Sequence, residues 1–171
     1  ALLMSLMALD IKPGDEIIVP NRTWIATVHA PLMLGAKLVM IDVLPERPVI
    51  DTSLIKDKIT PLTKAIIPAS LCGCGVNMDA IWKIARDNDL FVIEDAAQGV
   101  GVRYRCVEEC EIDKKCDSCN DKFKHVGTFG IAGILSFYGN KTMTCGEGGL
   151  ILTDDDEIAK KCYRLKNHGR D

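Results

Sequence analysis

The chain has 171 residues, 47% of them hydrophobic, and a formal net charge of −3. This size and composition suffice to bury the core of one soluble domain, and the acidic balance excludes the basic footprint of a nucleic-acid-binding protein. The apolar runs are far shorter than the roughly 20 residues that span a bilayer. No secretion signal is recognisable, so we expect a cytoplasmic protein that binds neither nucleic acid nor membrane.

Short apolar strands alternate with helical patterns along most of the chain. The predicted strands cover residues 16–20, 37–41, 65–68, 90–94, 134–138 and 149–153. The predicted helices cover residues 1–9, 23–34, 52–59, 79–88 and 155–166. Nearly continuous apolar strands separated by helices predict an α/β fold, with a mostly parallel sheet and helices on both faces. Such sheets bind ligands beyond the carboxyl ends of their strands, which points to residues 94–98 and 136–149.

The eight cysteines fall into two groups. We expect four to be reduced, because they are scattered among predicted strands and helices: Cys72, Cys74, Cys145 and Cys162. The other four lie in a polar insert at about residues 105–124: Cys106, Cys110, Cys116 and Cys119. Four thiolates suit the tetrahedral preference of zinc, with His125 as a substitute ligand, and a structural zinc site is one hypothesis. Free thiols and disulfides are the alternatives.

Asp95 directly follows an apolar strand, which places a carboxylate in a sheltered cleft. An uncompensated charge there is costly, so Asp95 needs a cationic partner such as the protonated ring nitrogen of pyridoxal phosphate (PLP). The alternative is that Asp95 caps the N-terminus of a helix after the strand.

Lys141 follows another apolar strand and precedes the glycines of residues 146–149. A partly desolvated lysine is a better nucleophile toward an aldehyde than a solvated one, and the glycines allow the backbone to approach a ligand closely. The alternative is an ordinary solvated loop lysine.

Several segments, in this order, carry a resemblance to a known family: Pro13-Gly14-Asp15-Glu16, Thr23-Trp24-Ile25-Ala26-Thr27, Thr63-Lys64-Ala65-Ile66-Ile67-Pro68, Val92-Ile93-Glu94-Asp95-Ala96-Ala97-Gln98, residues 136–149 and Asn167-His168-Gly169-Arg170. Over almost the whole chain they resemble the DegT/DnrJ/EryC1/StrS family of sugar aminotransferases. The resemblance implies the three-layer large domain of a fold-type-I PLP transferase.

The resemblance also implies roles for five residues. Lys141 would be the catalytic Schiff-base lysine, and Asp95 would pair with the pyridinium nitrogen. Gln98 would lie near the phenolic oxygen of the ring, Trp24 would stack on the ring face, and Ser136 would donate a hydroxyl to the cofactor phosphate. Burial in the core is the alternative for Trp24, and bonding to the main chain is the alternative for Ser136.

The family implies a homodimer that takes an amino group from glutamate and transfers it to the keto carbon of a nucleotide-linked sugar, for polysaccharide biosynthesis. The Gly139-Asn140-Lys141-Thr142 form of the lysine loop looks most like perosamine-synthase-type members, which act on a GDP-linked 4-keto-6-deoxy sugar. We expect residues 1–171 to be part of the PLP-binding large domain. The N-terminal segment and the C-terminal small domain would be absent, and the fragment alone would be inactive.

The chain departs from the family where its members often carry His-Leu-Tyr-Gly, because residues 70–73 read Ser-Leu-Cys-Gly, so we expect an altered side chain near the cofactor. Two other functions remain open: a PLP-dependent sugar dehydratase, which Lys141 disfavours because that branch has histidine there, and a non-catalytic relative that binds or regulates. A dinucleotide-binding oxidoreductase is excluded because no G-x-G-x-x-G follows the first strand.

Overall fold

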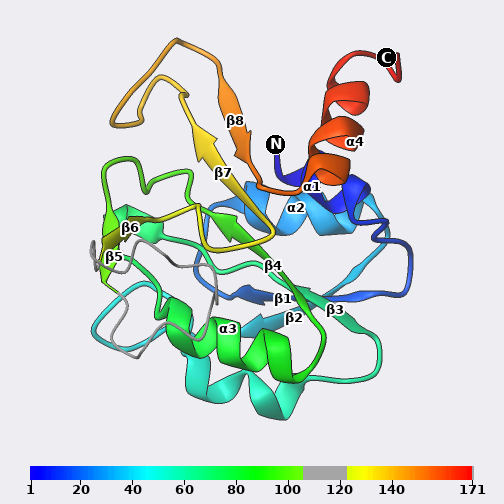
Figure 1. Cartoon of the computed structure of the whole chain (residues 1–171). Coiled ribbons are helices and arrows are strands. Elements are labelled where there is room, and N and C mark those ends of the chain that lie inside the picture. Colours follow the sequence, from blue (N-terminus) through cyan, green and yellow to red (C-terminus); the bar gives the residue numbers. More distant parts are fainter. Residues whose placement is uncertain (106–122, 171) are drawn as a thin grey trace.

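The computed structural model describes residues 1–105 and 123–170, which surround one central sheet (Figure 1). Its six strands run in the order β2-β1-β3-β4-β7-β8. They are β1 (Glu16–Pro20), β2 (Lys37–Ile41), β3 (Thr63–Ile66), β4 (Phe91–Asp95), β7 (Ala132–Ser136) and β8 (Gly149–Leu152). All neighbouring pairs are parallel except β7–β8, which is antiparallel. The predicted mostly parallel sheet is confirmed.

The central strands β1, β3, β4 and β7 are mostly apolar because they are largely buried on both faces of the sheet. In β1, Ile17 packs into one hydrophobic cluster and Ile18 into the other. Ile93 and Val92 of β4 divide between the same two clusters. Since successive side chains of a strand point to opposite faces, a strand covered on both sides has no solvent-facing position for polar residues.

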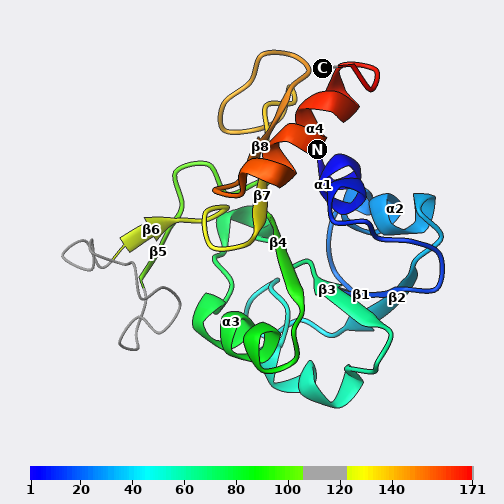
Figure 2. The ribbon, with the colours of Figure 1, turned by 45° about the vertical axis from the view of Figure 1, so that its right-hand side comes forward.

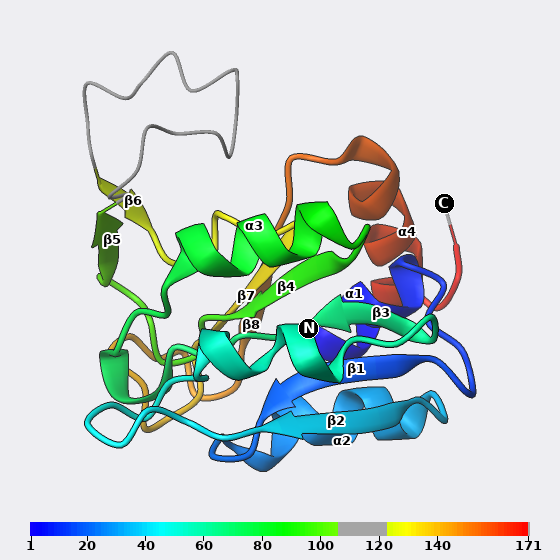
Figure 3. The same ribbon diagram turned by 90° about the horizontal axis from the view of Figure 1, so that it is seen from below.

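Helices cover both faces, as predicted (Figures 1 and 3). On one face, α1 (Leu2–Ala8) and α2 (Ile25–Met33) contribute Leu6 and Ala30 to the first cluster. On the other face, α3 (Met78–Asp87) contributes Ile81 to the second cluster. The last helix, α4 (Asp156–Lys166), packs against α1 through a third, small apolar cluster.

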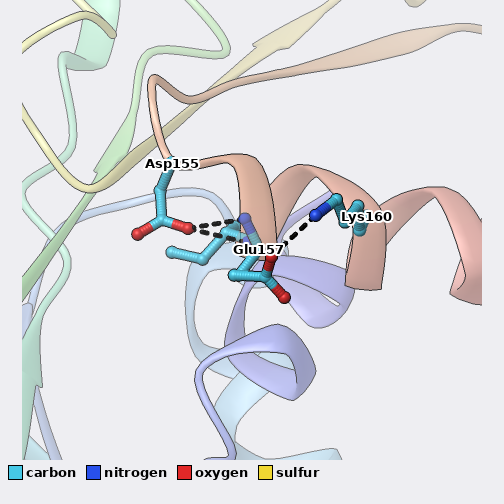
Figure 4. Close-up of polar contacts among 4 residues, drawn as sticks. Asp155, Glu157 and Lys160 are labelled. Atoms are coloured by element: carbon cyan, nitrogen blue, oxygen red, sulfur yellow. Dashed lines mark hydrogen bonds and ion pairs between the residues drawn. The ribbon is translucent and has the colours of Figure 1, made fainter.

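The N-terminus of α4 is fixed by its own sequence (Figure 4). The Asp155 carboxylate accepts hydrogen bonds from the backbone N–H groups of Glu157 and Ile158, both at 2.9 Å. These bonds satisfy two of the N–H groups that a helix start leaves without a partner. Lys160 adds an exposed ion pair with Glu157 at 2.7 Å.

The helix predicted over residues 52–59 is wrong in type, because the chain forms two 3₁₀ turns there, Thr52–Leu54 and Lys56–Lys58. The Asp51 carboxylate accepts hydrogen bonds from the backbone N–H of Ser53 at 3.0 Å and from its hydroxyl at 2.6 Å. Local bonds of this kind compete with the α-helical pattern. The other predicted elements lie within about two residues of their expected bounds, which is the usual precision of element ends.

A two-stranded hairpin leaves the sheet after β4. It consists of β5 (Arg103–Arg105) and β6 (Phe123–His125), and their antiparallel pairing places Arg105 opposite Phe123. The sequence did not predict these strands, which are only three residues each. The Cys-rich insert lies between them, and its cysteines fall outside the described residues.

Glu94 joins the end of β4 to the loop that precedes β7. Its buried carboxylate accepts backbone N–H bonds from Gly127 at 2.8 Å, Phe129 at 2.5 Å and Gly130 at 2.8 Å. Burial raises the pKa of Glu94, and these three bonds oppose that rise by favouring the charged form. The end of β4 is thus held against the loop that leads into β7.

Within residues 1–105 and 123–170, no helix has both the length and the apolar character needed to cross a membrane.

Candidate cofactor-binding site

A cavity of about 850 Å³ opens where β4 and β7 end. Its opposite wall comes from α1 and α2, which stand beside these strands (Figure 2). The structure brings all five residues that the sequence predicted for cofactor binding to this cavity: Trp24, Asp95, Gln98, Ser136 and Lys141. The two segments singled out at strand ends therefore face one crevice, as the topology of parallel sheets requires.

Asp95 is the last residue of β4, and only 8% of its surface is exposed. Its Oδ2 accepts a hydrogen bond from the Thr27 hydroxyl at 2.6 Å, and its Oδ1 accepts one from the Ala97 N–H at 3.2 Å. After Asp95 the chain makes a turn, closed by a bond from the Gly99 N–H to the Ala96 carbonyl at 2.8 Å. The alternative prediction, in which Asp95 caps a helix, is therefore wrong.

The electrostatics of Asp95 are set by burial. Desolvation raises the pKa of this carboxyl, whereas the hydrogen bonds from Thr27 and Ala97 lower it. The nearby ammonium group of Lys141 lowers it further. A carboxylate that is buried and aimed into a cavity gains most from a cationic partner, which would offset the lost hydration.

Lys141 lies in the turn between β7 and β8. Its backbone N–H donates to the Tyr138 carbonyl at 3.0 Å, and its side chain is half-buried at the cavity wall. The alternative of a fully solvated loop lysine does not match this position. Its amine thus faces the same cavity as Asp95, although the two residues are separated by 46 positions in the sequence.

Trp24 sits at the N-cap of α2 and is 65% exposed. The core alternative for this residue is therefore wrong. Its indole lines the cavity on the side of α2, where a flat aromatic face is available to a ring-shaped ligand.

Gln98 is oriented by the main chain. Its Oε1 accepts a hydrogen bond from the Cys72 N–H at 2.7 Å. Since the carbonyl oxygen of the amide is used in this bond, its NH₂ group is the end left to donate to a ligand oxygen. Ser136, at the end of β7, accepts a long bond from the Tyr138 N–H at 3.4 Å, so its hydroxyl keeps its proton for donation.

The departure at residues 70–73 reaches the cavity lining through Ser70, which stands where family members often carry histidine. The Cys72 side chain is exposed and is not part of the cavity lining, whereas Ser70 and Leu71 are. Cys72 has a positive φ of 53°, a backbone conformation that is uncommon for residues other than glycine. This turn directs the Cys72 N–H toward Gln98, so the main chain rather than the cysteine thiol acts on the site.

Three further residues of the site were not assigned a role from the sequence. Thr23 and His29 line the cavity beside Trp24, and Thr27 is fully buried against Asp95. A usable signal existed for the threonines, because they are four positions apart in the helix predicted over residues 23–34, and such positions share one face of a helix. No local pattern distinguishes His29 from a surface histidine.

The cavity fits PLP by the chemistry of its lining. A buried carboxylate suits a protonated ring nitrogen, an amine suits an aldehyde, and an indole face suits an aromatic ring. The Gln98 amide and the Ser136 hydroxyl provide donors for oxygen atoms.

The four cysteines proposed as zinc ligands, Cys106, Cys110, Cys116 and Cys119, lie outside the described residues. Among those that are described, no group of three or more His, Cys, Asp or Glu side chains is arranged to hold a metal. The substitute ligand, His125, is engaged by the main chain: Nε2 accepts from the Gly101 N–H at 2.8 Å, and Nδ1 contacts the Val126 carbonyl at 2.5 Å. An imidazole bonded in this way has no lone pair left for a metal. Zinc binding by the cysteines stays a prediction.

Comparison with known proteins places these observations in context. The model of the DegT/DnrJ/EryC1/StrS aminotransferase family matches residues 1–171. Among solved structures, DesV from S. venezuelae, in complex with a ketimine intermediate, is 35% identical with a TM-score of 0.85. The match covers 99% of this chain and 41% of DesV.

Two other solved structures are similar. NtdA from Bacillus subtilis, with bound cofactor PMP, is 35% identical with a TM-score of 0.82, over 97% of this chain and 34% of NtdA. DesI, in the presence of its TDP-sugar product, is 28% identical with a TM-score of 0.82, over 99% of this chain and 38% of DesI. The described fold is thus that of fold-type-I PLP transferases, and the chain spans well under half the length of these neighbours.

Proposed function

We propose, because the chain belongs to the DegT/DnrJ/EryC1/StrS aminotransferase family, that it supplies the PLP-binding part of a large domain in a sugar aminotransferase. The observation that carries this proposal is the convergence of Asp95, Lys141 and Trp24 on one cavity. These three side chains come from β4, from the β7–β8 turn and from the start of α2. Their joint exposure to one space is what a single aromatic cofactor requires.

When bound, PLP supplies an electron sink, which allows an amino group to pass between two substrates. Asp95 serves this chemistry by holding a proton on the ring nitrogen, because its buried carboxylate is stabilised by a cation. Trp24 covers one ring face and excludes water from it. Gln98 donates its NH₂ group to the phenolic oxygen, and Ser136 donates its hydroxyl to the phosphate.

Lys141 has two roles in the proposal. Its Nζ would hold the cofactor through the aldehyde carbon, whose oxygen would leave as water, and its free amine would accept and return a proton at the reacting carbon. Both roles need an amine inside the cavity rather than in bulk water. The half-buried position of Lys141 at the cavity wall supports them.

The amino acceptor in this proposal is a nucleotide-linked keto-sugar, of the 4-keto-6-deoxy class, and the amino donor is glutamate. The family supports a sugar substrate, and the DesI neighbour was solved in the presence of its TDP-sugar product. The lysine loop Gly139-Asn140-Lys141-Thr142 supports the 4-keto-6-deoxy class through its resemblance to perosamine-synthase-type members. Polysaccharide biosynthesis in the cytoplasm is the setting that this chemistry suggests.

A homodimer is part of the same proposal. Apolar side chains remain exposed on α2 and on the edge strand β2: Ile25, Leu32, Met33 and Met40. Exposed apolar patches of this kind commonly mark contacts with another polypeptide.

The test is chemical labelling of Lys141. We expect borohydride treatment of the PLP-loaded protein to attach a pyridoxyl group to the peptide that contains Lys141, as detected by mass spectrometry. Lys141→Ala should lose this label, whereas Lys64→Ala, which removes an exposed lysine of β3, should retain it.

Incubation of the full-length protein with glutamate and a panel of keto-sugar nucleotides then identifies the acceptor. Labelling without amino transfer to any of them would favour the non-catalytic alternative. Absence of PLP from the wild-type protein would contradict the proposal as a whole.

A further inference from the structure

We propose that Thr27 and Thr23 form a hydroxyl relay that orients Asp95 and keeps it ionised for a cationic ring nitrogen. This inference deepens the proposed function and rests on it for the identity of the ligand. Thr27 is a positioning residue here, because it acts through Asp95.

The relay is a chain of two short contacts. The Thr27 hydroxyl donates to Asp95 Oδ2 at 2.6 Å, and Thr23 Oγ1 lies 2.8 Å from Thr27 Oγ1. Thr27 is fully buried, whereas Thr23 lines the cavity. The relay therefore runs from the cavity wall into the interior, to the side of Asp95 that faces α2.

The direction of donation follows from counting protons. A threonine hydroxyl has one proton, and an ionised carboxylate has none to give. When Asp95 is ionised, Thr27 must therefore donate its proton to Asp95, so Thr23 must donate to Thr27. Both hydroxyl dipoles then point their positive ends toward Asp95, and the bond to the carboxylate is of the stronger, charge-assisted type.

The relay affects the ionisation of Asp95 because this carboxyl group is buried. Desolvation raises the pKa of Asp95, and the Thr27 hydroxyl is the strongest of the groups that lower it, ahead of the Ala97 N–H and Lys141. The amine of Lys141 is also the group proposed to react, so its charge changes during turnover. The two hydroxyls are constant, so Asp95 does not depend on Lys141 alone.

The first experiment measures PLP affinity in a double-mutant cycle. Thr27→Val removes the hydroxyl with little change of shape, and we expect it to weaken PLP binding by about tenfold, the range for a hydrogen bond to a charged group. Thr27→Ser, which keeps the hydroxyl, should stay within about twofold of wild type. In the Asp95→Asn background, Thr27→Val should have an effect of less than about twofold, because the charge that it serves is gone.

A matched control separates this coupling from ordinary loss of packing. Thr63 is also a buried threonine, but it lies at the start of β3, whereas Asp95 lies at the end of the neighbouring parallel strand β4. Thr63→Val should leave PLP affinity unchanged in both backgrounds. If Thr27→Val does not fold, Thr23→Val tests the relay instead. It should weaken PLP affinity by about threefold, and this effect should also disappear in the Asp95→Asn background.

The second experiment uses the protein without PLP and follows its thermal midpoint against pH. Because burial raises the pKa of Asp95 above the unfolded value, its contribution to stability is present at acid pH and is lost as pH rises through the folded value. Thr27→Val removes a bond that favours the charge, so its deficit relative to wild type should grow as pH rises. The other titratable side chains lining the cavity are unchanged in both proteins: His29, Tyr138 and Lys141.

Equal effects of Thr27→Val with Asp95 and with Asp95→Asn would overturn the inference, as would a deficit that is independent of pH. If wild type binds no PLP, the proposed function fails, and the pH series still decides whether Thr27 stabilises the Asp95 charge. If wild type binds PLP and the cycle shows no coupling, only the relay fails.

Discussion

At the scale of single residues, the cavity depends on polar side chains that the main chain orients. Gln98 shows this most directly, because the Cys72 N–H occupies its carbonyl oxygen and leaves its NH₂ group to donate. The Asp95 carboxylate is held in the same manner, by the Ala97 N–H on one oxygen and the Thr27 hydroxyl on the other. The chemistry available to each side chain is therefore decided by its neighbours.

This reasoning predicts the effect of Gln98→Glu. A carboxylate keeps the acceptor for the Cys72 N–H but replaces the donor with a second negatively charged oxygen. We expect PLP affinity to fall by about tenfold or more, because a phenolic oxygen of PLP then meets repulsion instead of a hydrogen bond. Asn88→Asp makes the same charge change at the end of α3 and serves as the control in an absorbance titration. Equal affinity of Gln98→Glu and wild type would show that Gln98 does not donate to the cofactor.

At the scale of elements, helix ends and strand ends have different origins. α4 begins where a local side chain, Asp155, bonds to the first free N–H groups (Figure 4). The end of β4, by contrast, is fixed by the Glu94 carboxylate, which holds a loop more than thirty residues away in sequence. The start of α4 therefore depends on residues next to it in the sequence. The end of β4 depends on a contact that forms only when the chain folds.

The cap predicts a measurable loss of stability. Asp155→Ala should lower the free energy of unfolding by about 1 kcal/mol, the usual contribution of an N-cap. For a protein of this size, the thermal midpoint should fall by about 2–4 °C. Asp154→Ala, which removes the same charge at the adjacent exposed position, should have a much smaller effect. A similar fall in both variants would mean that charge rather than capping stabilises α4.

At the scale of the whole molecule, the fold holds a cavity whose buried carboxylate costs stability until a cation fills it. Burial raises the pKa of both Asp95 and Glu94, but only Asp95 lines the cavity. Glu94 is already bonded to three backbone N–H groups. Of these two buried carboxyl groups, Asp95 is therefore the one whose charge a bound ligand can stabilise.

We accordingly expect PLP to stabilise the protein through Asp95. At a ligand concentration about 100 times the dissociation constant, the gain in unfolding free energy is about 2.7 kcal/mol, or a rise in the thermal midpoint of about 5–10 °C. In Asp95→Asn this gain should largely vanish, while the protein without PLP should become more stable near neutral pH. That second change follows because the variant has no buried carboxyl to ionise. Calorimetry with and without PLP measures both, and an unchanged PLP gain in Asp95→Asn would contradict the pyridinium role.

The sequence by itself determined the order of the sheet strands and the α-helices, though not the short strands β5 and β6, because continuous apolar runs such as residues 16–20 and capped amphipathic runs such as 156–166 are local patterns. It also identified the segments of Asp95 and Lys141 as strand-end positions and, through the family resemblance, assigned their roles. Its errors were local ones, as at residues 52–59, where the Asp51–Ser53 bonds favour 3₁₀ turns.

Only the tertiary structure decided which side chains share a space. The burial of Thr27 against Asp95, the exposure of Trp24 and the bond from Cys72 to Gln98 each join segments that are distant in sequence or depend on what covers them. Hydrogen bonds and desolvation act over a few ångströms in space, whereas a sequence pattern records only neighbours along the chain. For that reason the relay behind Asp95 became visible only when α2 was placed against the end of β4.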